Sequence, residues 1–151
     1  MKPIQIQVSG LTPQTPPEIC QRFLDTERWS DFEGYAILPG IASARFEHRS
    51  PGLVGSRIRV LNRDGSSHVE EIIEWDPEQT IAMKFQEFSP PLRQLASHFV
   101  ERWQFSQTAA GTQITRSMEF YPKHFLGWMM LQPIAQLMKK AFEKSAGAQA
   151  A

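Results

Sequence analysis

The sequence is short of the features that mark several common classes of protein. It contains a single cysteine, Cys20, in 151 residues, so no disulfide can form within the chain. Its 16 basic and 16 acidic residues cancel and form no block of like charge, which argues against nucleic acid or an anionic membrane as the partner. No apolar run is long enough to span a bilayer, so we expect no stable membrane insertion.

The N-terminus lacks an apolar targeting segment. The stretch MKPIQIQVSG alternates between apolar and polar residues instead of carrying the continuous apolar region of a signal peptide. The lone cysteine falls on the apolar side of a predicted helix. These observations favour a cytoplasmic protein in which Cys20 is a small buried hydrophobe rather than a reactive thiol.

The motifs of the common catalytic chemistries are also missing. There is no glycine-rich phosphate loop, no nucleophile elbow and no cluster of cysteine and histidine with the spacing of metal ligands. His68 and Glu70 are two residues apart on a predicted strand and could share a face, as two metal ligands would. The other histidines, His48, His98 and His124, have no comparable neighbour. We therefore expect no metal and no cofactor.

What the sequence does contain predicts one domain over residues 1–151, with 41% hydrophobic residues to build its core. Ile4, Ile6 and Val8 alternate with polar residues, as in a half-buried strand. The segment 15–18, Thr-Pro-Pro-Glu, has the capping residue, prolines and glutamate that begin a helix. A second, shorter helix is expected over 26–32.

From residue 41 the hydrophobic period changes to two. Short connections rich in proline, glycine and aspartate separate the candidate strands, which indicates an antiparallel meander. A long helix is predicted over 124–144, apolar nearly all round from Phe125 to Leu131 and therefore buried there on more than one side. The candidate strands are 41–48, 56–63, 67–75, 80–88, 96–106 and 111–121.

The expected architecture is α+β, in the order β-α-α-β6-α. About seven strands form a curved antiparallel sheet that wraps around the long C-terminal helix. A wedge-shaped internal cavity between the sheet and this helix is the expected ligand site. Loops 33–40 and 89–95 are the expected gates to it.

Three pieces of sequence stand out: Glu74-Trp75-Asp76-Pro77, Trp103-Gln104-Phe105, and Gly111-Thr112 followed by Ile114. They resemble the START-like polyketide cyclase/dehydrase group (SRPBCC, the helix-grip fold), and the resemblance covers nearly the whole chain. It implies the fold more strongly than the function. Members of the group bind hydrophobic small molecules in an internal cavity; some cyclise or dehydrate polyketides, and others carry lipids or hormones.

Strand alternation predicts which side chains line the cavity. Pairing of Phe105 with Thr112 would place Glu101 opposite Arg116 on the inward face, as a buried ion pair or a ligand anchor. The inward residues of three strands are expected to be Ile81, Met83 and Phe85; Ser97, Phe99, Glu101, Trp103 and Phe105; and Thr112, Ile114, Arg116, Met118 and Phe120. The expected ligand-binding residues are Phe85, Phe99, Glu101, Trp103, Arg116, Met118, Met130, Ile134 and Met138.

Strand 67–75 has two alternative faces. An extra bulge residue in the turn at Asp64-Gly65 would turn His68, Glu70 and Ile72 inward, the alternative that we favour. A two-residue turn would instead bring in Val69, Glu71, Ile73 and Trp75.

The function we favour is binding of an apolar small molecule or lipid in the cavity, by a monomer or homodimer. The alternative is a cyclase or dehydratase, in which Glu101 or Glu70 moves a proton beside a carbonyl that Arg116 or His68 orients. A third hypothesis is a protein-interaction module that docks through the methionine-rich C-terminal helix.

Overall fold

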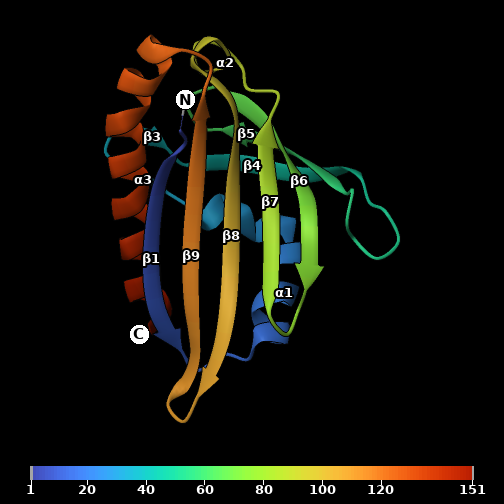
Figure 1. Ribbon diagram of the computed structural model, residues 1–151. Coiled ribbons are helices and arrows are strands. Elements are labelled where there is room, and N and C mark those ends of the chain that lie inside the picture. Colours follow the sequence, from blue (N-terminus) through green and yellow to red (C-terminus); the bar gives the residue numbers. More distant parts are fainter. Residues whose placement is uncertain (1, 151) are drawn as a thin grey trace.

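The computed structural model describes the backbone of residues 2–150 and the side chains of residues 2–146. Strands dominate the chain from residue 34 to residue 122, and a long helix ends it (Figure 1). The elements are β1 (Ile4–Thr12), α1 (Pro16–Leu24), η1 (Thr26–Asp31), β2 (Gly34–Tyr35), β3 (Leu38–Pro39), β4 (Ile41–His48), β5 (Arg57–Asn62), β6 (Ser67–Asp76), β7 (Thr80–Gln86), α2 (Leu92–Leu95), β8 (Ala96–Thr108), β9 (Gly111–Pro122) and α3 (Phe125–Ala150).

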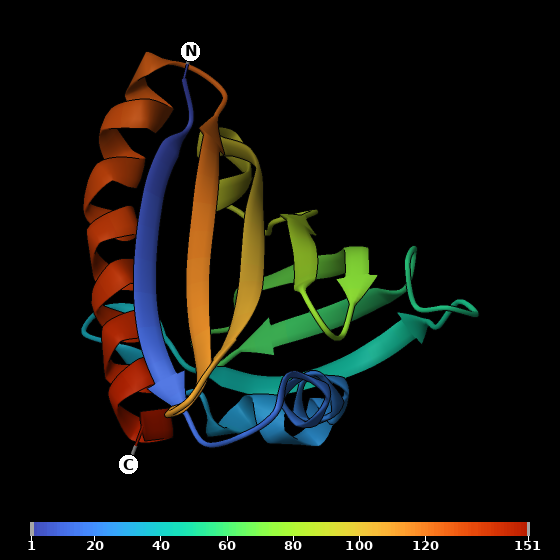
Figure 2. The same ribbon diagram turned by 60° about the horizontal axis from the view of Figure 1, so that its bottom comes forward.

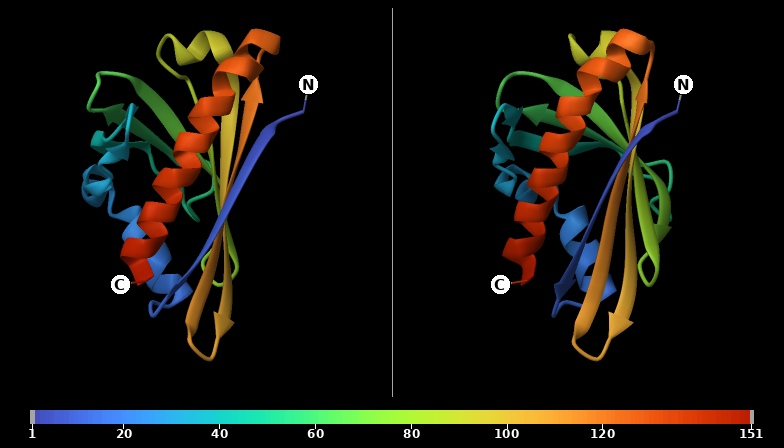
Figure 3. Two further views of the ribbon diagram at one scale, coloured as in Figure 1. Left: turned by 90° about the vertical axis from the view of Figure 1, so that its left-hand side faces the viewer. Right: turned by 60° about the vertical axis from the view of Figure 1, so that its left-hand side comes forward.

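The main sheet has seven strands in the order β1-β9-β8-β7-β6-β5-β4, all paired antiparallel. It is strongly bent: β1, β9 and β8 run alongside α3, whereas β4 and β5 run across them (Figure 2). Helix α3 packs mainly on β1 and β9 and also touches α2, β2 and β3. It covers one face of the bent sheet (Figure 3). This arrangement confirms the predicted fold class.

The start of α1 forms as the sequence indicates. Thr15 is the N-cap residue, and its hydroxyl oxygen accepts a hydrogen bond from the backbone N–H of Glu18 at 3.3 Å. The same hydroxyl donates to the Glu18 carboxylate at 3.0 Å. The first of these bonds satisfies a backbone donor that the first helical turn leaves free, and the second holds the two side chains together. The helix then buries Ile19 and Cys20 against the sheet.

Both predicted gate loops contain regular structure that the sequence did not indicate. Residues 33–40 include the short hairpin β2-β3, and residues 89–95 include the single turn α2. Both pack on α3, so tertiary contacts stabilise segments whose prolines and glycines predict only loops. The approach of α2 to α3 is close: a Cβ on Gly127 would lie 2.3 Å from the carbonyl oxygen of Leu95.

The first turns of α3 are not buried on several sides, so that prediction is wrong. Phe125 and Leu126 are 63% and 59% exposed, and Met129 and Met130 are 51% and 50% exposed. The sheet covers only one side of the helix here, so the apolar side chains on its other side stay exposed. Helix α3 also continues to Ala150, beyond the predicted end at residue 144. Within residues 2–150 no helix is both long and apolar enough to cross a bilayer.

Two apolar clusters form the core, one under each helix. The α3 cluster joins β1, β8, β9 and α3, and fully burying a side chain such as Phe120 there contributes about 1.5–3 kcal/mol. The α1 cluster joins α1 to the inner residues of β6 to β9. The α3 cluster consists of Ile4, Ile6, Phe88, Ala96, Phe99, Met118, Phe120, Leu131, Ala135 and Phe142. The α1 cluster consists of Ile19, Cys20, Ile72, Ile81, Met83, Trp103 and Ile114.

Candidate functional site

The hairpin β8-β9 sets the geometry of the site, and its register differs from the prediction by two residues. A tight turn pairs Thr108 with Gly111, so Trp103 lies opposite Arg116 and Glu101 opposite Met118. The sequence placed the hairpin closure earlier, because the polar stretch from residue 106 looks like a longer loop. A shift of two residues keeps every side chain on its predicted face, since strand faces repeat every two residues.

Glu101 and Arg116 still meet, because they are diagonal neighbours on the inward face. The Arg116 Nε–H donates a hydrogen bond to the Glu101 carboxylate. Glu101 is buried, with 3% exposure, whereas the Arg116 side chain is 20% exposed. The ion pair that the sequence predicts is therefore present, although through a different register.

A second polar pair comes from β6. His68 lies opposite Val60, and Glu70 lies opposite Ile58, so both face inward as the favoured alternative predicts. The reason is a long turn in which Asn62 N–H donates to the Ser66 carbonyl oxygen at 2.8 Å. Further along, a register shift between Ile72 and Glu74 turns Trp75 inward, where it packs on the α1 cluster. Trp75 therefore faces inward as the other alternative predicts, and Val69, from the same alternative, is fully buried.

The two pairs form what we call the polar row: His68, Glu70, Glu101 and Arg116. His68 Nε2 lies 2.9 Å from the Glu70 carboxylate, and the imidazole stacks on Phe85 with ring centroids 5.1 Å apart. Glu70 is 4% exposed. Burial raises the pKa of the Glu70 carboxyl, and its hydrogen bond with His68 opposes that rise. The row therefore contains a carboxyl group whose proton is held more tightly than usual.

Arg116 is clamped between two aromatic rings. Its guanidinium carbon lies 4.6 Å from the ring centroid of Trp103 and 3.7 Å from that of Phe142, on α3. The Trp103 contact follows from the observed register, which places the two residues opposite each other. Cation-π contacts of this kind stabilise a partly desolvated charge by about 1–2 kcal/mol.

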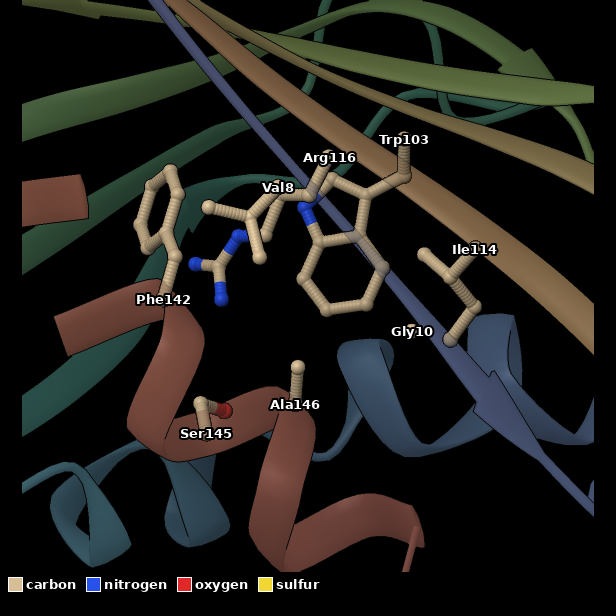
Figure 4. Close-up of a pocket in the computed structure, with 8 residues that line it drawn as sticks. All are labelled: Val8, Gly10, Trp103, Ile114, Arg116, Phe142, Ser145 and Ala146. Carbon is tan, nitrogen blue, oxygen red and sulfur yellow. The ribbon is translucent and has the colours of Figure 1, made fainter. Parts of the chain in front are cut away.

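Next to this clamp lies a cavity of about 20 Å³ (Figure 4). Such a volume holds roughly one water molecule. Helix α3 closes it from one side, and Gly10 permits the close approach, because a Cβ at this position would lie 3.0 Å from the Ala146 Cβ. The lining residues are Val8, Gly10, Trp103, Ile114, Arg116, Phe142, Ser145 and Ala146.

One residue that lines this cavity has a polar atom without a partner. Trp103 is 8% exposed, and its Nε1–H finds no hydrogen-bond acceptor among the described residues. A buried donor without an acceptor is unusual and costs about 1–3 kcal/mol. In Figure 4 the indole nitrogen lies on the edge of the ring that faces Arg116.

Most of the other predicted wall residues gather in or against the α3 cluster. These are Phe85, Phe99, Met118, Ile134 and Met138. Met130 does not join them, because its side chain is half-exposed. Ser97 is also exposed, because a register shift between Ala96 and His98 breaks the alternation at the start of β8.

The remaining candidates lie outside the site. Cys20 is buried, and burial together with Asp76 and Glu78 raises the pKa of its thiol to about 11, so it stays protonated at neutral pH. His98 stacks on Tyr121 at 4.3 Å. His124 accepts the Gly127 N–H at 3.0 Å before the first turn of α3. Within residues 2–150 no group of three or more His, Cys, Asp or Glu side chains has a metal-site arrangement.

Several cavity residues were not predicted. Gly10 was interpreted only as the end of the first strand, and Phe142 only as part of the apolar stripe of the helix. No local pattern marks Ser145 or Ala146, because their place depends on how far α3 extends.

A larger hollow of about 820 Å³ lies beside α1, but polar and charged side chains dominate its lining: Gln14, Glu18, Gln21, Arg22, Leu24, Asp25, Arg28 and Arg49.

Comparison with known proteins agrees with this architecture. The profile of the family described as "Polyketide cyclase / dehydrase and lipid transport" matches residues 26–151. A comparison with curated proteins finds no match.

Solved structures resemble the whole chain at low sequence identity. Major latex-like protein 151 from Panax ginseng aligns with a TM-score of 0.65 and 13% identity over 99% of each chain. A START superfamily protein from Mycobacterium smegmatis aligns with a TM-score of 0.70 and 11% identity over 99% of this chain and 97% of that one. A protein from Thermus thermophilus aligns with a TM-score of 0.68 and 15% identity over 97% of each chain. At these identities the likeness shows the fold alone.

Proposed function

Because the chain belongs to the polyketide cyclase / dehydrase and lipid transport family, we propose that it binds an apolar small molecule or lipid between α3 and the inner face of the sheet. The main observation behind this proposal is the polar row, which places titratable side chains in a mainly apolar interior. Buried charged groups are costly, and two or three polar anchors in an apolar wall are typical of small-molecule sites.

The ligand requires α3 to move. Sites for small molecules have volumes of roughly 300–1,000 Å³, whereas the cavity beside Arg116 has about 20 Å³. The C-terminal half of α3 supplies Phe142, Ser145 and Ala146 to the cavity, so displacing it opens the interior at the polar row. Small side chains at this contact, with Gly10 opposite Ala146, leave few interlocking atoms to separate.

A pair of variants tests the site. Ser145→Phe places a large ring in the cavity, whereas Lys144→Phe adds the same ring at an exposed position of the same helix. We expect the wild-type protein and Lys144→Phe to bind a hydrophobic reporter dye, and long-chain or polycyclic compounds to displace it. Ser145→Phe is expected to lose most of this binding. Equal dye binding by both variants would place the ligand elsewhere.

A search for a co-purified ligand complements the dye. Mass spectrometry of the purified protein under native and then denaturing conditions would reveal an apolar molecule released on unfolding. If no such molecule is found, and neither the dye nor any apolar compound binds, the binding function is wrong.

A second candidate, a cyclase or dehydratase, is favoured by Glu70. Its carboxyl has a raised pKa and a hydrogen bond to His68, which are properties of a general acid or base. In a dehydration its carboxylate would take the proton from the carbon next to a substrate carbonyl and pass that proton to the β-hydroxyl, which leaves as water while the carbon-carbon double bond forms. Its signature is exchange of that carbon-bound proton for deuterium in D₂O, which Glu70→Gln should abolish. If a ligand binds but shows no exchange, the protein binds that ligand without catalysing the dehydration.

A further inference from the structure

Two hydrogen-bond donors lie side by side at the cavity. The Trp103 Nε1–H has no acceptor among the described residues. Arg116 uses its Nε–H for Glu101, while its terminal nitrogens extend toward Phe142 and Ser145 of α3 (Figure 4). Both side chains line the cavity, so a group that enters it lies beside two residues that carry free or partly free donors.

The charges around these donors restrict what that group can be. The positive charge of Arg116 is already balanced by its ion pair with Glu101. A second buried carboxyl, Glu70, interacts electrostatically with both of them. A carboxylate on the ligand would add a negative charge beside these two acidic groups, in a setting where like charges repel strongly. An uncharged acceptor avoids that repulsion and still satisfies the donors.

The size of the cavity agrees with an uncharged oxygen. A volume of about 20 Å³ accommodates one group of the size of a water molecule, so the space for the oxygen is already present, whereas the rest of the ligand requires the movement of α3 described above. The oxygen of a ketone or an ester is such a group. The hydrocarbon attached to it would then lie along the apolar wall under α3, where the proposed function already places the ligand.

We infer that this cavity recognises the uncharged carbonyl oxygen of an apolar ketone or ester, with Trp103 Nε1–H and a terminal N–H of Arg116 as its donors. The inference rests on the proposed function and adds the chemical class of the ligand. It assigns Trp103 a polar role in addition to its packing, and it explains why a donor without an acceptor is retained in the interior.

Three probes of similar length separate this chemistry from its alternatives: 2-undecanone, undecane and decanoate. We expect the ketone to bind roughly tenfold more tightly than the alkane and the carboxylate, as one or two net hydrogen bonds allow. Binding is measured by displacement of the reporter dye at neutral pH. Equal affinity for the ketone and the alkane, or tighter binding of decanoate, would overturn the inference while leaving the binding function intact. Binding of none of the probes would overturn both.

The indole N–H resonances provide a direct readout in the wild-type protein. The chain has four tryptophans, and Trp103→Phe assigns the resonance of interest by its loss. On addition of 2-undecanone, we expect the Trp103 N–H signal to move downfield as it gains an acceptor, whereas undecane leaves it near its original position. The same small shift of the Trp103 signal with both probes would contradict the inference.

A matched pair of variants then tests specificity. Trp103→Phe keeps an aromatic ring but removes the donor, so it should lose the preference for the ketone over the alkane. Trp128→Phe removes an indole N–H from α3 outside the residues that line the cavity, and should keep that preference. An unchanged preference in a folded Trp103→Phe variant would show that the indole does not bind the carbonyl.

Discussion

The polar row and the α3 cluster face the same interior, but different interactions hold them in place. In the α3 cluster, residues such as Phe120 and Leu131 are fully buried and need only close packing. In the polar row, each buried carboxylate requires its own partner, which is His68 for Glu70 and Arg116 for Glu101. The α3 cluster can therefore tolerate exchanges of similar volume, whereas the row depends on each member.

The comparison also separates stability from function. Stability is a sufficient reason for the packing of the α3 cluster, because burial of apolar area stabilises the fold. Stability is not a sufficient reason for the polar row, since replacing a buried ion pair by apolar residues of similar volume is often neutral or stabilising. Stability alone therefore does not explain why the polar row is buried, whereas a role in ligand binding does.

The largest expected effect is at Trp103, a residue of the α1 cluster that packs on Arg116 of the polar row. Trp103→Ala should lower the free energy of unfolding by about 3–5 kcal/mol, because it removes a buried ring and one side of the Arg116 clamp. Urea denaturation measures the loss. Trp103→Phe should retain most of the stability, and a loss below about 1 kcal/mol for the alanine variant would show that the ring is not part of the core.

Removing the positive charge of the row should cost somewhat less. Arg116→Met leaves Glu101 buried without its partner, and we expect a loss of about 3 kcal/mol, at the lower end for a broken buried pair because Arg116 is partly exposed. Urea denaturation again provides the measurement.

The double variant Arg116→Met/Glu101→Gln sharpens this result. It should recover much of the loss, because no unpaired charge remains. A normal ligand affinity in a stable double variant would make the pair purely structural. An Arg116→Met variant as stable as the wild type would contradict the pairing itself.

Glu70 gives the row a pH dependence that the α3 cluster lacks. Its pKa in the folded protein lies above the ordinary value of 4.5, so its contribution to stability is complete below pH 4.5 and is lost as the pH rises through the raised pKa. The slope is at most about 1.4 kcal/mol per pH unit. Glu70→Gln should remove it, and thermal or urea unfolding across pH 4–8 measures the difference. Parallel pH profiles for the two proteins would refute the assignment.

The smallest effect is expected on α3 outside the core. Met130→Ala should change the free energy of unfolding by no more than about 0.5 kcal/mol, because the side chain is half-exposed. Its neighbour Leu131 is fully buried, and Leu131→Ala should cost about 2–5 kcal/mol. Ligand affinity should also be unchanged in Met130→Ala. A weaker affinity would show that Met130 contacts the ligand, as the sequence predicted.

Much of the fold could be predicted because its signals are local. The strand from Ile41 to His48 has the predicted bounds, and the helix cap at Thr15 forms as expected. The inward faces of β8 and β9 are correct from Phe99 onward because side chains alternate along any strand. The site was predicted less completely, since its register, its cavity and its contacts with α3 depend on segments far apart in the chain.

The sequence by itself determined the alternation that turns Glu101 and Arg116 inward, together with the strands and helices that carry them, and it favoured the inward one of two possible faces for His68 and Glu70. These properties follow from the identity and spacing of neighbouring residues. Only the tertiary structure decided that Trp103 faces Arg116, that Phe142 completes the clamp, and that Met130 lies outside it. Those outcomes depend on the length of one turn and on the path of α3 across the sheet, which are set by packing between distant elements and leave no local pattern.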